Sequence, residues 1–172
     1  MTIIKIIAII ILFFILNEVK NNNSLMFFTT WFTLLSILFI MGQDYNLIFE
    51  NLLPTVTIGS ILVFIGYIVI LYGNPELEYN ISKKFNINYN IIILRSIILH
   101  VLPLFYFYYL TKISGIKNIS SSLYIFVLIL FYLLYNFENP YNIYGIYRYK
   151  NITFIIYLFI TTLLAYLIYY LY

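Results

Sequence analysis

Six long apolar stretches separated by short polar connections constrain this chain more than any other feature of its sequence. A helix that crosses a membrane needs about 20 mostly apolar residues, because each residue rises about 1.5 Å through a hydrocarbon core of about 30 Å. The stretches that approach this length are residues 2–17, 25–41, 52–72, 91–110, 119–135 and 152–172. We therefore predict an all-α fold: an integral membrane bundle of six transmembrane helices that forms a single domain over residues 1–172.

The composition agrees with a membrane protein. Hydrophobic residues make up 64% of the 172 positions and charged residues 9%, against about 45–50% and about 25% in soluble domains. A soluble domain of this size cannot bury that much apolar surface. These values exclude a soluble enzyme and a disordered chain, and we expect a multi-pass protein located in a membrane, with membrane lipids as its partners.

The charged residues and potential metal ligands exclude two further classes of site. Nine Lys and Arg residues are scattered against six Asp and Glu residues, so no basic patch marks a nucleic-acid partner. The chain has no Cys and a single His, which makes a metal site improbable. We expect no nucleic-acid partner, no metal and no cofactor.

The first stretch has a second interpretation, as a signal peptide with Lys5 as its charged end. Such a peptide ends in a small-residue cleavage motif, whereas residues 17–20 read Asn-Glu-Val-Lys. We predict a retained helix, with the Lys5 ammonium reaching the interface.

The fourth stretch carries two ionisable side chains, Arg95 and His100. Such residues inside a span cost roughly 2.5–3.5 kcal/mol on insertion scales and therefore suggest a functional site. Ser96 lies one turn before His100 on the same face. Pro103 cannot donate to the Leu99 carbonyl, so we expect a kink and a free acceptor beside His100. The alternative is a histidine that only bonds to a neighbouring helix or to that carbonyl.

Hydroxyl side chains form a stripe at helical spacing along the second stretch, at Thr29, Thr33 and Ser36. In membrane helices such hydroxyls usually bond to their own preceding turn. The second and fourth stretches start from the same side of the membrane in a six-span topology. We therefore expect Thr29 and His100 to approach each other within one leaflet.

These motifs resemble the androgen-induced-gene family of small six-helix membrane proteins. The resemblance rests on Phe28-Thr29-Thr30-Trp31 at the start of the second span, a third span that ends near Tyr72 and Glu76, and His100-Val101-Leu102-Pro103 in the fourth. A loop rich in Tyr, Gly and Pro over residues 139–148, which we interpret as a lid, precedes the last span. The resemblance extends over nearly the whole chain.

Animal members of that family hydrolyse fatty-acid esters of hydroxy fatty acids with an intramembrane threonine and histidine. The resemblance implies that Thr29 is the nucleophile and His100 the general base. The animal enzymes place their histidine two residues farther from the proline than His100 lies from Pro103, a rotation of about 200° on a helix. We expect a lipid-ester substrate, with Arg95, Ser96 and Thr33 at its binding site and Arg95 holding its carboxylate.

Two functions remain open on the sequence alone. One is an intramembrane lipid-ester hydrolase built on Thr29 and His100. The other is a non-catalytic multi-pass protein with a lipid-binding, transport or assembly role, in which the same polar residues stabilise helix packing. The hydrolase requires the Thr29 hydroxyl within roughly 3–4 Å of a His100 nitrogen, directly or through a water.

Overall fold

A computed structural model describes residues 2–22, 28–73, 75–135 and 151–171, and these residues contain helices and turns but no strand. The prediction of an all-α protein is therefore confirmed for them. The helical elements, in chain order, are α1 (Thr2–Asn22), α2 (Phe28–Gly42), α3 (Asn46–Gly73), α4 (Leu77–Phe85), α5 (Tyr89–Ser96), the π-helical segment η2 (Ile97–Val101), α6 (Leu102–Ser114), α7 (Ile119–Ser122), α8 (Tyr124–Tyr135) and α9 (Asn151–Leu171).

Two helices are long and apolar enough to cross a membrane. They are Asn46–Gly73, of 28 residues, and Tyr89–Ser114, of 26 residues, in which α5, η2 and α6 run on continuously. At about 1.5 Å per residue, each exceeds the hydrocarbon core of about 30 Å. These helices indicate that the protein associates with a membrane. Four shorter apolar helical segments accompany them: Ile3–Asn17, Phe28–Gly42, Ser120–Leu134 and Ile155–Leu171.

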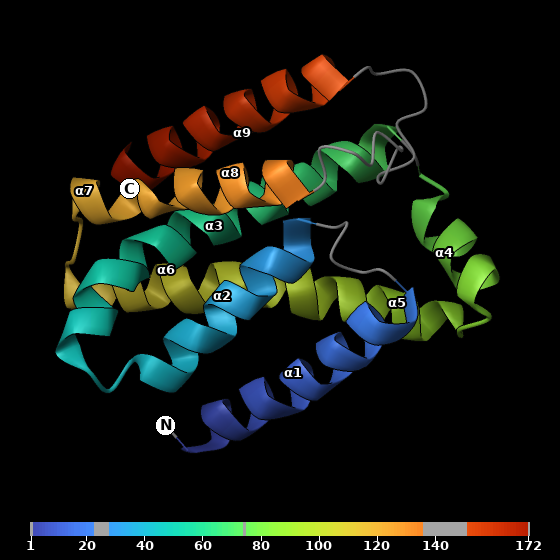
Figure 1. The fold of residues 1–172 in the computed structure, drawn as a ribbon, viewed down its shortest axis with the longest axis horizontal. Helices are drawn as coiled ribbons and strands as arrows, with labels where there is room; N and C mark the ends of the chain where they lie inside the picture. The colour runs from blue at the N-terminus through green and yellow to red at the C-terminus, as the bar shows by residue number, and fades with distance from the viewer. Residues whose placement is uncertain (1, 23–27, 74, 136–150, 172) are drawn as a thin grey trace.

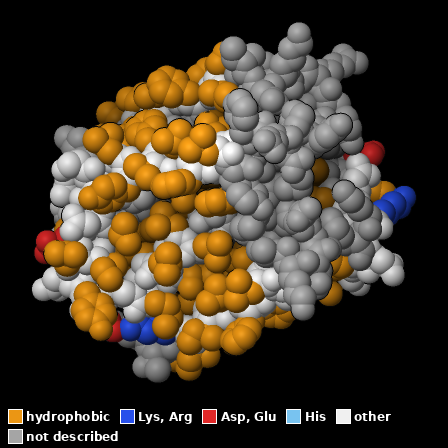
Figure 2. Space-filling model, viewed as in Figure 1, with side chains coloured by type: hydrophobic (Ala, Val, Ile, Leu, Met, Phe, Trp, Pro, Cys, Tyr) orange, Lys and Arg blue, Asp and Glu red, His pale blue; other side chains and the backbone are white. Residues whose placement is uncertain are grey.

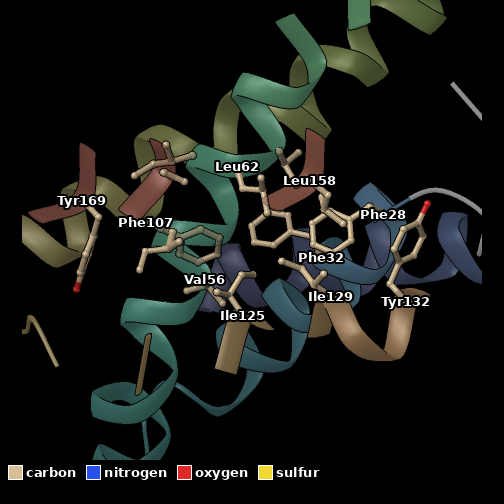
Figure 3. Packing of buried hydrophobic residues seen from close by; sticks show 14 of the residues in the cluster. Phe28, Phe32, Val56, Leu62, Phe107, Ile125, Ile129, Tyr132, Leu158 and Tyr169 are labelled. Carbon is tan, nitrogen blue, oxygen red and sulfur yellow. The ribbon is translucent and has the colours of Figure 1, made fainter. Parts of the chain in front are cut away.

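The helix α3 is the centre of the bundle. It packs against α2, α6, α7, α8 and α9, whereas α1 packs against α2, so α1 and α9 lie on opposite sides of the molecule (Figure 1). Figure 3 shows the buried hydrophobic cluster that these helices share, in which Phe32 and Phe107 are fully buried and meet edge to face. The helices α2, α3, α6, α8 and α9 thus share this aromatic core, whereas α1 packs on α2 through a second cluster of Ala8, Ile15 and Ile37.

Apolar side chains also cover much of the outside. Phe13, Phe105, Phe131 and Leu167 each expose more than half of their surface. Figure 2 shows hydrophobic side chains across the part of this face that is not grey, with charged groups at its edges. This distribution is the reverse of a soluble surface and suits contact with lipid tails.

The structure differs from the predicted spans mainly at their ends. The third helix begins at Asn46 rather than at residue 52, because polar residues can continue a helix beyond its apolar part. The connection after it contains α4, which the sequence does not predict. This helix is nine residues long and amphipathic, so it lacks the apolar run by which the other helices are recognised. The expected lid over residues 139–148 lies outside the described residues.

Candidate active site

The Thr29 hydroxyl and the His100 imidazole meet between α2 and η2. Thr29 Oγ1 lies 3.3 Å from His100 Nε2, although 71 positions separate the two residues in the chain. Both side chains are half-buried. The structure thus brings together the two groups that the sequence predicts to approach each other, within the distance that proton transfer between them requires.

A second hydrogen bond orients the imidazole. His100 Nδ1 lies 2.8 Å from the Ser96 carbonyl oxygen, which can only accept, so Nδ1 carries the proton and donates it. In a neutral ring Nε2 then holds a lone pair that faces the Thr29 hydroxyl, and that hydroxyl donates to it. This is the arrangement in which a hydroxyl can lose its proton to a histidine base.

The helix that carries His100 is wound irregularly at that residue. Residues Ile97–Val101 form a π-helical turn, and the Leu102 N–H donates to the Ile97 carbonyl five positions earlier. Pro103, at the start of α6, supplies no N–H to the preceding turn, which favours a change of register at this point. The sequence predicts the Leu99 carbonyl as the acceptor beside His100, whereas the imidazole uses the Ser96 carbonyl. π-Turns of this kind occur frequently at functional sites.

Two residues at this site escape the sequence analysis. The Tyr67 ring, on α3, stacks on the His100 imidazole with the ring centroids 4.2 Å apart and the planes 16° apart. The Tyr67 hydroxyl donates to the Glu78 carboxylate on α4, and Glu78 is buried. A tyrosine near the end of an apolar stretch is most simply interpreted as an interfacial residue, and Tyr67 fits that description. Its place six residues before the end of α3, about 9 Å along the helix, is the signal that could have identified it.

The other predicted site residues surround the pair in different ways. Ser96 provides the carbonyl that accepts from His100, and its side chain lies beside the Tyr67 hydroxyl. Arg95, in the last turn of α5, is half-buried and close enough to His100 to act on it electrostatically. Thr33 is buried, and its hydroxyl donates to the Thr29 carbonyl at 2.7 Å. Thr33 therefore bonds within its own helix, to the turn that carries Thr29.

Across the residues with a defined position, no three His, Asp or Glu side chains come together in a way that could hold a metal ion. No family model matches the sequence, and neither a curated protein nor a solved structure matches it.

Proposed function

We propose that this chain is an intramembrane hydrolase of lipid esters, with Thr29 as nucleophile and His100 as general base. One observation carries the proposal: the Thr29 hydroxyl lies 3.3 Å from His100 Nε2, while Nδ1 of the same ring is held at 2.8 Å by the Ser96 carbonyl. A hydroxyl, a base and a group that orients the base form the arrangement that activates a nucleophile.

The proposal includes a six-span membrane topology and kinship with the androgen-induced-gene family. In support of the topology, the two long apolar helices and the four shorter apolar segments overlap the six stretches expected from the sequence. The large exposed hydrophobic side chains on α1, α8 and α9 agree with lipid contact on these shorter helices as well. The localisation proposed is a multi-pass membrane protein.

The reaction follows from the geometry. As the Thr29 oxygen attacks the ester carbonyl carbon, its proton passes to His100 Nε2. The resulting tetrahedral intermediate expels the alcohol, which takes that proton from the imidazole and leaves an acyl ester on Thr29. Water then attacks this ester while His100 accepts one of its protons, and that proton passes to the Thr29 oxygen as the fatty acid is released.

A lipid ester is the substrate class that suits this position. On the helix that carries His100, the exposed neighbours Leu94, Ile97 and Leu102 are all apolar, so a substrate with long acyl chains would approach the pair from the bilayer. Arg95 lies near His100 on the preceding turn, and its guanidinium is suited to hold a carboxylate of the substrate.

A lipid phosphonate that reacts with activated serine and threonine hydroxyls tests this proposal. We expect the wild-type chain in detergent to form a covalent adduct, measured by fluorescence of the labelled band. Thr29→Ala removes the nucleophile and should abolish labelling, while His100→Ala removes the base and should slow labelling by about 100-fold or more.

The matched control is Thr162→Ala on α9. The Thr162 hydroxyl is buried and donates to the Leu158 carbonyl of its own helix, so its loss tests whether removal of any buried threonine hydroxyl disturbs the fold. This variant should be labelled as the wild type is. Labelling that persists in both Thr29→Ala and His100→Ala would contradict the hydrolase and favour the non-catalytic alternative.

A further inference from the structure

We propose that Tyr67 is a positioning residue for His100 and that Glu78 holds Tyr67 in place, so that α4 determines the orientation of the base. The catalytic consequence rests on the proposed function, whereas the orientation of the ring does not. Neither residue belongs to the Thr29–His100 pair.

The imidazole needs a second constraint. Its bond from Nδ1 to the Ser96 carbonyl fixes one edge of the ring, but a ring held at one edge can still pivot about that hydrogen bond. The Tyr67 ring lies nearly parallel to the imidazole, at 4.2 Å between centroids, and blocks this rotation on one face. The two contacts together direct Nε2 at the Thr29 hydroxyl.

The Tyr67 side chain, on α3, is held in place by a residue of another helix, α4. Its hydroxyl donates to the Glu78 carboxylate in the first turn of α4. Glu78 exposes 9% of its surface, and a carboxylate at such a position needs hydrogen bonds to offset its loss of hydration. The bond therefore stabilises both partners and ties α4 to α3.

Apart from the bond between Glu78 and Tyr67, α4 packs against α5. The two helices are in contact, and the rings of Tyr79 and Tyr89 meet edge to face at 6.3 Å. The helix lies across the end of the bundle where α5 begins (Figure 1). A displacement of α4 would thus move the Tyr67 ring, which stacks on the His100 imidazole, and would change the orientation of that imidazole.

The chain contains a single histidine, so the test can observe this ring alone. We would label histidine with ¹³C and ¹⁵N, purify the chain through a histidine-free tag, and record the imidazole signals in detergent micelles. The stacked Tyr67 ring should shift the carbon-bound ring protons of His100 upfield. Tyr67→Leu should remove this shift, whereas Tyr67→Phe, which keeps the ring but lacks the hydroxyl that donates to Glu78, should retain only part of it.

The matched control is Tyr72→Leu, the same substitution five positions later on α3. Tyr72 is 90% exposed, so this variant should leave the His100 signals unchanged. Helicity by circular dichroism verifies that each variant is folded. Glu78→Ala should broaden or move the His100 signals, and Glu78→Gln, which retains an acceptor oxygen, should restore them.

Phosphonate labelling of the same variants provides the catalytic readout. Tyr67→Leu should slow labelling by about tenfold or more, since small misplacements of a base have large effects on rate, and Tyr67→Phe should fall between this variant and the wild type, because it keeps the ring but loses the bond to Glu78. Unchanged His100 signals in folded Tyr67→Leu would overturn the inference, as would shifted signals with an unchanged labelling rate. If the wild type is never labelled but Glu78→Ala moves the His100 signals and Glu78→Gln restores them, the link from α4 to the imidazole is supported and the hydrolase is rejected.

Discussion

Gly59 lies where α3 comes into close contact with two neighbouring helices. A Cβ atom at this position would meet Phe32 Cε2 at 2.6 Å and Ile125 Cδ1 at 3.2 Å. Phe32 and Ile125 are both fully buried members of the aromatic core (Figure 3). The absence of a side chain at residue 59 thus allows α2 and α8 to approach the central helix.

Gly59→Ala should therefore destabilise the fold. We expect a loss of about 1–3 kcal/mol, the usual effect of overpacking a core, measured as a lower thermal unfolding midpoint in detergent. The matched control is Gly73→Ala at the end of α3, where an added Cβ meets nothing within 4 Å. Equal midpoints for the two variants would contradict the close packing described for Gly59.

At the scale of residues, the sequence predicts part of the site and misses the rest for a physical reason. His100 is identifiable because an ionisable group within an apolar run is costly, and Thr29 because the order of the spans directs it to the same region. Neither of these sequence features identifies Tyr67 or Glu78. One looks like an interfacial tyrosine and the other like a loop carboxylate, and their contact depends on how α4 folds back towards α3.

The π-helical turn is the element that sets the direction of His100. It contains one more residue per hydrogen-bonded turn than an α-helix, so the residues after it are rotated relative to those before it. Pro103 predicts an irregularity in this helix, but not which of its carbonyls the imidazole would use. That choice depends on the register of residues Ile97–Val101 as a whole.

Deletion of Ile98 should convert this segment into a regular α-helix. His100 would then lie three positions after Ser96, so the bond from its imidazole to the Ser96 carbonyl could no longer form as observed. We expect helicity by circular dichroism to be maintained and phosphonate labelling to fall by about tenfold or more. Labelling at the wild-type rate in the folded deletion variant would show that the turn is dispensable.

At the scale of the whole molecule, the apolar stretches predict most of the helices because length and hydropathy determine what can exist in lipid. They do not predict α4, because its polar face lowers its mean hydropathy below that of the other helices. They also do not predict the extension of α3 back to Asn46. The Lys5 ammonium, expected to reach the interface, pairs with the Asp44 carboxylate in the turn between α2 and α3. This ion pair links the start of α1 to the turn between α2 and α3, and the pattern of apolar residues does not predict such a contact.

The helix Tyr89–Ser114 should place the residues at its two ends on opposite sides of the membrane. The chain has no cysteine, so single replacements at the exposed residues Asn80 and Lys117 can be read without background. In sealed vesicles, a membrane-impermeant maleimide should modify one of Asn80→Cys and Lys117→Cys, and the other only after permeabilisation. Modification of both in intact vesicles would contradict a crossing by this helix.

The π-turn also has a genetic consequence. It differs from an ordinary helix by one residue, so the insertion of a single codon is enough to produce it. The helices on either side can keep their packing, because the extra residue is absorbed within one turn. In a chain of this architecture, one inserted codon could thus turn the imidazole towards the Thr29 hydroxyl, starting from an ancestor in which the same histidine pointed elsewhere.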